Sequence, residues 1–372
     1  MRMRPRRWSI HRDERGATLA FVAVSIFVLL GVLALSVDFG ALFADRRRMV
    51  NAADAAALAA ALTYAKKDAA CGTNDAPAQA QADSLATANT AGAKPGDSKG
   101  QNAYVVDCAK KTVTVRYNLT HKYLFAGAIG FKSTPVVTTA SGHWGPAGGA
   151  GDVLPVMVNM GRLSTCQIPG TQKGTDCYFY VDSSALGNAS WALMNVQPAC
   201  GDSHFGWNVS VASCSSKVGL PDPWYTCPSF SDADMINLIN NGSPAISINY
   251  PATTYVCNST GNRPNIFRAL DNLGGKTRLF AVNDPQKQIK KGGTPAPPPA
   301  TPDFFDVVGF IQMKIVDVWR GNDAQWDVAN CPGPKNSNAY CLHAIWLGYT
   351  TDPGKICDTC QDFGVEAIGL RG

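Results

Sequence analysis

The sequence is poor in charged residues, which make up 16% of its 372 residues. It has 5 histidines, and neither Gly-x-Ser-x-Gly nor His-Glu-x-x-His occurs. Because these patterns mark large groups of hydrolases, we expect a protein that is not an enzyme. The formal net charge of +5 comes from an excess of arginine within the first 48 residues. The nearly neutral remainder gives no sign of nucleic-acid binding.

Charge is absent altogether from residues 17–37. A helix of this length is about 30 Å long, enough to cross the hydrocarbon core of a bilayer. Six arginines precede the segment within residues 1–15, and three follow it at residues 46–48. Since basic residues stay on the cytoplasmic side, we expect a cell-membrane protein with a cytoplasmic N-terminus and an extracytoplasmic remainder. A cleaved secretory signal is the alternative, although its apolar part is usually only about 7–15 residues long.

Cysteine is missing from the first 70 residues, and all 12 cysteines follow the apolar segment. Disulfides persist outside the cytoplasm, so this distribution agrees with the predicted orientation. A Cys71–Cys108 bridge would tie a helix to a hairpin, whereas the other pairings stay open. The candidate disulfide cysteines are Cys71, Cys108, Cys166, Cys177, Cys200, Cys214, Cys227, Cys257, Cys331, Cys341, Cys357 and Cys360.

Cys357 and Cys360 form a Cys-x-x-Cys pattern. Such a pair can be a redox centre or, with Cys341 and His343, part of a zinc site. No second Cys-x-x-Cys occurs, and the chain has ten other cysteines. We therefore expect a structural disulfide here, and no metal or cofactor.

One long helix is expected from the apolar segment to about Tyr64, because alanine dominates residues 52–61 and no proline interrupts the run. The order of features is Gly16-Ala17, the apolar span, Asp38, the arginines of residues 46–48 and the stretch AADAAALAAA at residues 52–61. This order resembles the N-terminal region of TadG-like proteins of the tight-adherence (Flp-type) pilus assembly family. The resemblance continues more weakly through residues 112–115, 125–131 and 136–142.

The resemblance also bears on processing. Pilin-like members of the wider Tad group are cleaved after a glycine and carry glutamate at the fifth position of the mature chain. Counted from Ala17, this position is Phe21. The resemblance therefore favours a membrane-retained member that is not a pilin.

The helix beyond the span presents small residues around most of its circumference, which permits close approach of another helix. We expect this segment to couple the chain to another single-span protein of the apparatus; the alternative is that it lies along its own domain. The predicted coupling residues are Asp38, Asn51, Asp54, Ala56, Leu58 and Ala60.

The expected fold class is α+β, with the long helix followed by a β-rich, disulfide-linked extracytoplasmic domain. Residues 1–15 form a basic tail, 16–65 the helix, and 66–144 a small α+β region. In this region, residues 76–91 predict a second helix, and the alternation of Val113, Val115 and Tyr117 predicts a strand over residues 112–120. Residues 145–151 read as a glycine-rich linker, and 152–372 as the β-rich domain. Within the latter, residues 153–160, 177–182, 278–282 and 307–318 predict strands, and residues 232–240 predict a helix with Ser231 as its N-cap and Asn241-Gly242 as its stop. The proline-rich residues 292–302 predict a solvated loop inserted into a hairpin of the last two strands.

Three further patterns are weak. Asp182-Ser183-Ser184 begins like the D-x-S-x-S metal motif of a von Willebrand-type domain, but residue 186 is leucine. The run of residues 275–277 imitates the end of a P-loop whose first glycine would be Leu270. The tryptophans at 191, 207, 224, 319 and 326 are expected in the core, with an exposed binding face as the alternative.

The sequence thus predicts a non-catalytic, membrane-anchored component of a Tad/Flp-type pilus assembly or secretion apparatus. Its expected partners are the membrane and other single-span Tad proteins, and not nucleic acid. A membrane-tethered surface adhesin or ligand-binding protein is the alternative, and an anchored hydrolase is a third possibility.

Overall fold

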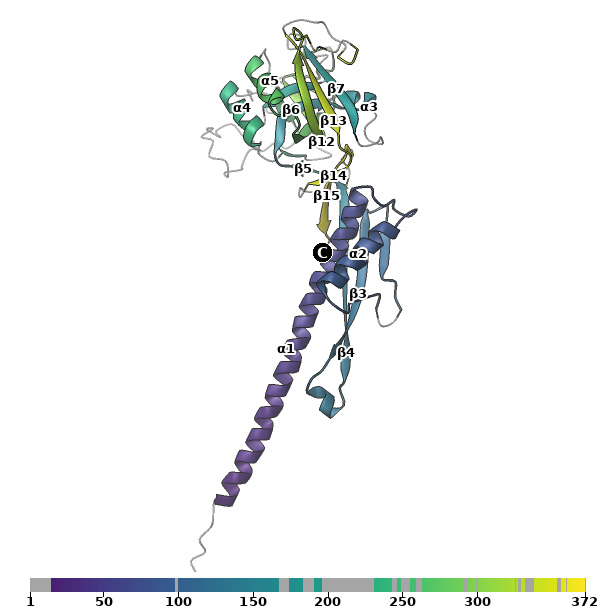
Figure 1. Cartoon of the computed structure of the whole chain (residues 1–372), viewed down its shortest axis with the longest axis vertical. Helices are drawn as coiled ribbons and strands as arrows, with labels where there is room; N and C mark the ends of the chain where they lie inside the picture. The colour runs from purple at the N-terminus through teal and green to yellow at the C-terminus, as the bar shows by residue number, and fades with distance from the viewer. Residues whose placement is uncertain are drawn as a thin grey trace, which may run out of the picture. The chain divides into compact units, whose positions relative to one another are not determined.

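The structure is a computed structural model (Figure 1). It describes residues 15–97, 100–166, 174–182, 191–195, 231–242, 246–248, 255–258, 263–290, 294–298, 300–324, 326, 329–331, 338–352, 356–358 and 360–371. The chain divides into two compact units. The first comprises Met1–Ala56, Asp83–Val105 and Val115–Ala140, and the second comprises Ala57–Ala82, Val106–Thr114 and Ser141–Gly372.

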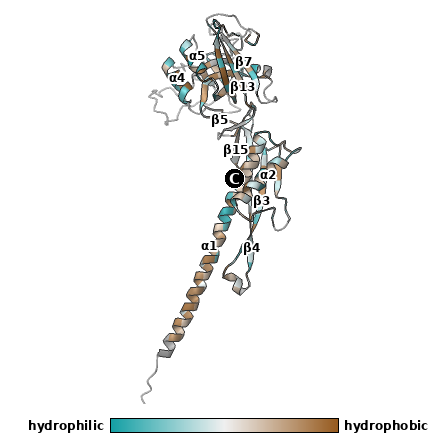
Figure 2. Ribbon diagram, viewed as in Figure 1, coloured by the Kyte–Doolittle hydropathy of each residue, from teal (hydrophilic) through white to brown (hydrophobic). Residues whose placement is uncertain are grey.

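Helix α1 (Arg15–Ala65) confirms the prediction of one uninterrupted helix through the apolar segment and the alanine-rich stretch. Its apolar half is exposed, with Phe21 76% and Phe27 78% accessible. The most apolar window has a mean hydropathy of 2.8 and no buried residue, so α1 is long and apolar enough to cross a membrane. Figure 2 shows this apolar half in brown, followed by a hydrophilic segment where Arg46, Arg47 and Arg48 lie.

One sheet of the fold has six strands, most of which follow α1 and α2 directly in the sequence. Helix α2 (Ala76–Asn89) confirms the second predicted helix. The strands are β1 (Lys94–Pro95), β2 (Tyr104–Asp107), β3 (Thr112–Lys122), β4 (Ser133–Pro146), β14 (Thr350–Asp352) and β15 (Val365–Leu370), and the 3-10 helix η1 (Ala126–Ile129) lies between β3 and β4. The sheet order is β1-β3-β4-β15-β14, with β2 paired to β3. As the alternation in the sequence predicts, Val113, Val115 and Tyr117 of β3 are buried.

A seven-stranded sheet forms the β-rich part. Its strands are β6 (Val153–Asn159), β7 (Thr175–Asp182), β8 (Trp191–Asn195), β10 (Tyr255–Asn258), β11 (Thr277–Asn283), β12 (Phe304–Arg320) and β13 (Ala339–Trp346). The order is β10-β8-β6-β11-β12-β13-β7, and β10 also pairs with β12, so five strands close on themselves. Strands β6 and β11 are parallel, whereas β11 and β12 form the predicted antiparallel pair. Strands β5 (Gly149–Ala150) and β9 (Ile246–Ser247) form a separate pair.

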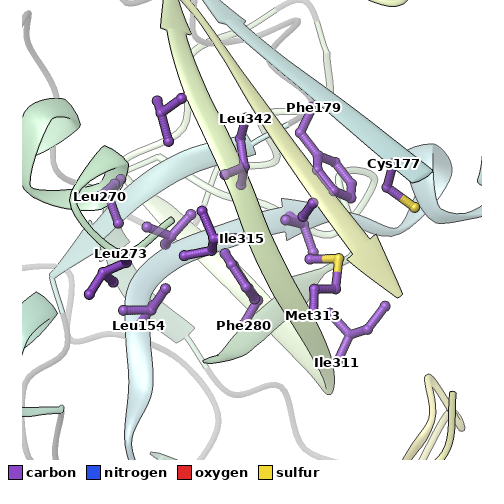
Figure 3. Close-up of a cluster of buried hydrophobic side chains, with 14 of the residues drawn as sticks. Leu154, Cys177, Phe179, Leu270, Leu273, Phe280, Ile311, Met313, Ile315 and Leu342 are labelled. Carbon is purple, nitrogen blue, oxygen red and sulfur yellow. The ribbon is translucent and has the colours of Figure 1, made fainter. Parts of the chain in front are cut away.

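In its described residues the second unit also has three short helices: α3 (Met160–Thr165), α4 (Asp232–Asn241) and α5 (Pro264–Asp271). The start and stop predicted for α4 are confirmed, since the Ser231 side chain accepts a hydrogen bond from the Asp234 amide and Gly242 caps the other end. Helices α4 and α5 bury Met235, Ile266 and Leu270 in a large core. Figure 3 shows part of this core, where Leu270 and Leu273 lie near Leu154, Phe280 and Ile315.

Two predicted loops differ in the structure. Of residues 145–151, expected to be a linker, all but Gly151 lie within β4 and β5 or between them, and Ala147 and Ala150 are buried. These small residues pack in a core with Val153 and Ala367 rather than serving as a flexible connection. The domain boundaries themselves stay a prediction.

The proline-rich segment is not wholly solvated in its described residues 294–298 and 300–302. Ala296 is fully buried, and its amide donates to the Gln288 carbonyl at 2.8 Å. Ile289 forms isolated bridges with Pro295 and with Phe304. Proline lacks only the amide donor, so its neighbours can still complete these hydrogen bonds.

Candidate functional site

The C-terminal half of α1, beyond the apolar span, has a buried stripe of small residues. Alanine side chains occupy most of this stripe, and larger side chains close it at both ends. Its members are Met49, Ala52, Ala53, Ala56, Ala57, Ala60, Ala61 and Tyr64, each at most 2% exposed. The stripe repeats every three or four residues, as expected for one face of a helix. This face of α1 is therefore covered by the chain's own fold.

Gly142 shows how closely a strand approaches this stripe. A Cβ atom at Gly142 would lie 2.4 Å from the Ala57 carbonyl oxygen and 3.1 Å from the Ala61 Cβ atom. No side chain fits at that distance, so the contact requires glycine on β4 and alanine on α1. Nearby, the Tyr64 and Trp144 rings stack with their centroids 4.5 Å apart.

Polar groups hold the earlier part of the same helix. The Asp38 carboxylate, 3% exposed, accepts hydrogen bonds from the amides of Leu124, Phe125 and Ala126. Two turns later, Asp45 Oδ2 lies 2.7 Å from His121 Nδ1. Asp38 and Asp45 are seven residues apart and thus project from nearly the same side of α1.

Two backbone carbonyls of α1 are also used as acceptors. The Thr138 hydroxyl donates to the Met49 carbonyl at 3.2 Å, and the Thr90 hydroxyl donates to the Arg48 carbonyl at 3.2 Å. Strand β4 and the residue after α2 thus contact the helix through specific hydrogen bonds as well as through alanine packing. Each such bond contributes on the order of 1 kcal/mol to stability.

These contacts revise the predicted coupling surface. Ala56 and Ala60 are fully buried by the chain itself, so they are not available to dock another helix. The physical reason is the one that prompted the prediction: small residues permit close approach, and here the protein's own fold makes that approach. Asp38 is likewise buried and holds a loop. Asn51 is exposed, and Asp54 and Leu58 are partly exposed.

The exposed side of the same helix carries residues that the sequence analysis did not select. Phe39 is 53%, Phe43 62% and Val50 42% exposed. Asp54 and Leu58 continue this row at intervals of four residues from Val50, so they share its face. The sequence does place large apolar residues at helical spacing beyond the span. They were not selected because alanine is so abundant there that the prediction was based on the small residues.

An ionic cluster around the buried Glu366 lies beyond the end of α1. The Lys67 ammonium is 3.0 Å from Glu366 Oε1 and 3.4 Å from Asp362 Oδ2, and it lies 4.9 Å from the centre of the Tyr349 ring. Glu366 is fully buried. Burial, followed by the charge of Asp362, raises the pKa of Glu366 from 4.5 to about 7, against the opposing charge of Lys67. Burial works to lower the pKa of Lys67, but the two carboxylates hold it above its usual value.

The described cysteines largely form disulfides, as predicted. Cys71 pairs with Cys108, Cys331 with Cys341, and Cys357 with Cys360. The Cys-x-x-Cys pattern is therefore a disulfide, and Cys341 is not available as a thiolate ligand for zinc. Cys257 is also disulfide-bonded. Cys200, Cys214 and Cys227 lie outside the described residues.

Cys166 and Cys177 differ from the disulfide prediction, because both are buried thiols. A hydrogen bond with Cys166, together with burial, raises the pKa of the Cys177 thiol above its usual range. Both belong to the large core cluster with Phe179 and Leu193, where a thiol packs as a small apolar group.

The structure adds no support for the D-x-S-x-S metal motif or for the P-loop pattern in the residues that it describes. Asp182 ends β7, and Ser183, Ser184 and Leu186 lie outside the described residues. The P-loop imitation at residues 275–277 follows α5 and leads into β11, the reverse of the strand-loop-helix order that a P-loop requires.

The tryptophan prediction is confirmed for Trp326, which is 5% exposed. Trp319 is partly buried on β12, near the stacked rings of Tyr178 and His343, whose centroids are 4.4 Å apart. The side chain of Trp191 and the residues Trp207 and Trp224 lie outside the description.

Taken together, the described residues form a candidate membrane-spanning helix that continues into a β-rich, disulfide-bonded fold. Residues 16–64 match a family model described as "Putative Flp pilus-assembly TadE/G-like". The N-terminal region is therefore TadE/G-like, which confirms the resemblance seen in the sequence, and the match supports a pilus-related role. Comparisons with curated proteins and with solved structures found no match to this chain.

Proposed function

We propose that this protein is a non-catalytic, membrane-anchored component of a Tad/Flp-type pilus assembly or secretion apparatus. Residues before the span lie in the cytoplasm and the remainder lies outside it. The observation that carries the proposal is the coincidence of the family match, residues 16–64, with nearly the whole of α1. The shared feature is thus the apolar span together with the helical segment that follows it.

In this proposal, one part of the surface of that helical segment contacts the protein's own fold and another part contacts a partner. The buried stripe from Met49 to Tyr64 fixes α1 to its own fold. Other residues of the same helix, Phe39, Phe43 and Val50, are exposed and free to pack against another single-span protein of the apparatus. Large apolar residues that stay exposed next to a membrane span are typical of a contact surface.

Site-specific photocrosslinking in living cells tests this proposal. A photoreactive phenylalanine analogue replaces Phe43 in one strain and Val50 in another, while matched strains carry it at Leu85 or Val105, which are 38% and 52% exposed on α2 and β2. We expect Phe43 and Val50 to crosslink to a second single-span protein and the controls to give no such product. Deletion of the protein should abolish pili.

The alternatives give different results in the same experiment. Normal piliation of the deletion strain, with no crosslink from Phe43 or Val50, would contradict the assembly role. If that strain instead loses attachment to surfaces, the protein is a tethered adhesin.

A further inference from the structure

Asp38 occupies a particular place on α1, one residue beyond the uncharged segment of residues 17–37. Its Oδ1 atom accepts a hydrogen bond from the Leu124 amide at 2.8 Å, and its Oδ2 atom accepts from Phe125 at 3.1 Å and Ala126 at 2.7 Å. Three consecutive amides thus surround one carboxylate, which compensates for its burial. The start of the β3–β4 loop is thereby fixed to α1 at the level where the apolar span ends.

The loop fixed in this way is apolar and exposed. Leu124 is 73%, Phe125 51% and Phe131 66% exposed. The loop is nevertheless ordered by hydrogen bonds, since η1 lies within it, the Phe131 amide donates to the Ala126 carbonyl at 3.0 Å, and the Tyr123 amide donates to the Lys132 carbonyl at 3.2 Å. Each large apolar side chain left in water forgoes the favourable free energy of burial. An ordered loop with three such side chains therefore presents an interaction surface.

Its position and flanking residues point to lipid as the contact. The loop begins beside Asp38, and the neighbouring residues Val37 and Phe39 of α1 are themselves 46% and 53% exposed. The loop thus begins at the level of α1 where the apolar span ends. Exposed Lys122 and Lys132 flank the loop on both sides. Apolar and aromatic residues bordered by lysine are typical of segments at the bilayer interface, where the ammonium groups reach lipid phosphates.

We propose that residues 124–131 form a second membrane contact, which enters the interfacial layer of the leaflet in which the apolar span of α1 ends. Asp38 sets the depth of this loop relative to the span, and Lys122 and Lys132 bind lipid headgroups. The protein is then held by a helix and a loop together, which restricts rotation and tilt of α1 in the bilayer. This inference rests on the membrane anchoring proposed above.

Photolabelling from lipid tests the proposal on the full-length chain. The protein is reconstituted into nanodiscs of phosphatidylethanolamine and phosphatidylglycerol that contain a lipid with a diazirine near the start of its acyl chain. After irradiation, tryptic peptides are identified by mass spectrometry. Cleavage after Lys122 and Lys132 isolates residues 123–132 in one peptide. We expect adducts on this peptide and on the span, and none on the peptides that contain Leu85 or Val105.

Two variants make the test specific. Leu124→Ser combined with Phe131→Ser removes two exposed side chains, so the fold should persist while labelling of residues 123–132 falls severalfold and labelling of the span is unchanged. Asp38→Ala removes the acceptor for the loop amides and should have the same effect on labelling, whereas Val105→Ser should change neither peptide.

The outcomes separate this inference from the anchor itself. Adducts on the span without adducts on residues 123–132 would overturn the loop contact and leave the anchor intact. A loop that crosslinks to a protein in cells but not to lipid would show a protein partner instead and likewise overturn the inference. Absence of adducts on the span would refute the anchor on which both proposals depend.

Discussion

Glu366 shows how a single buried residue makes this fold sensitive to pH. Its side chain is fully buried, with Lys67 Nζ 3.0 Å from one oxygen and Asp362 close by as a second acid. One lysine shared between two carboxylates leaves an excess of negative charge when both are ionised. Burial is the main cause of the raised pKa of Glu366, and its protonated form also relieves this excess of negative charge.

The pH dependence of stability should change when Glu366 is neutralised. Its pKa rises from 4.5 to about 7 on folding, so the folded protein retains a proton that the unfolded chain releases. This contribution to stability is complete below pH 4.5 and is lost as the pH rises through 7. We expect Glu366→Gln to raise the thermal unfolding midpoint relative to wild type at pH 8 and to make little difference near pH 4.5. Circular dichroism in detergent from pH 4.5 to 8 measures this.

The control is Asp68→Asn, because Asp68 is exposed. Its pH profile should follow that of the wild type. Parallel profiles for wild type and Glu366→Gln would show that the carboxyl of Glu366 does not gain its proton on folding.

The residues of α1 also show the limit of sequence reasoning. The run of small residues correctly predicted a face that another element approaches closely. It did not identify that element, because alanine packs equally well against a foreign helix or the protein's own strand. The decisive partner, Gly142, lies far along the chain and has no local signature. For the same reason, the sequence showed Asp38 just beyond the span but not the amides of Leu124 to Ala126 that its carboxylate binds.

At the scale of elements, strands were predicted both where one face is exposed, as in β3, and where the strand is largely buried, as in β6 and β12, but β13 was missed. Val113, Val115 and Tyr117 alternate with more exposed residues, so β3 was recognised. Strand β13 reads as a nearly continuous apolar run in which six of eight residues are buried. A run of this kind has no period of two, so it cannot be told from a buried helix by pattern alone. Helix α5 was not predicted, because its 8 residues are too few to show a clear helical periodicity in the sequence.

The disulfides should stabilise the fold according to the loops that they close. Cys71 and Cys108 are 37 residues apart, whereas Cys357 and Cys360 are separated by 3. By loop entropy, the first pair should contribute about 4 kcal/mol and the second less than about 2 kcal/mol. Urea unfolding in detergent should therefore show a larger loss for Cys71→Ser with Cys108→Ser than for Cys357→Ser with Cys360→Ser.

Equal losses for the two double variants would contradict the loop-entropy argument. A larger loss for the second pair would show that residues 357–360 stabilise the protein through packing, since Cys360 lies in a core with Ala147 and Val365.

At the scale of the whole molecule, the proposed role depends on α1 remaining intact. The fifth residue after Gly16 is Phe21, which is 76% exposed on α1, where pilin-like Tad proteins carry glutamate. We therefore predict that the chain is not cleaved after Gly16. Mass spectrometry of membranes, sheared surface filaments and medium should find peptides spanning Gly16 and Ala17 in the membrane fraction. A chain that begins at Ala17 in the filaments would make it a minor pilin.

The last strand has a consequence for biosynthesis. Strand β15 lies between β4 and β14 in its sheet, and its Glu366 pairs with Lys67, 299 residues earlier in the sequence. A ribosome-bound chain therefore lacks an interior strand of this sheet until almost all of the sequence printed here has been made. A premature stop codon that removes residues 365–370 would leave β4 and β14 with unpaired edges. Such truncated chains should be recognised by quality-control proteases, however well the earlier segments have folded.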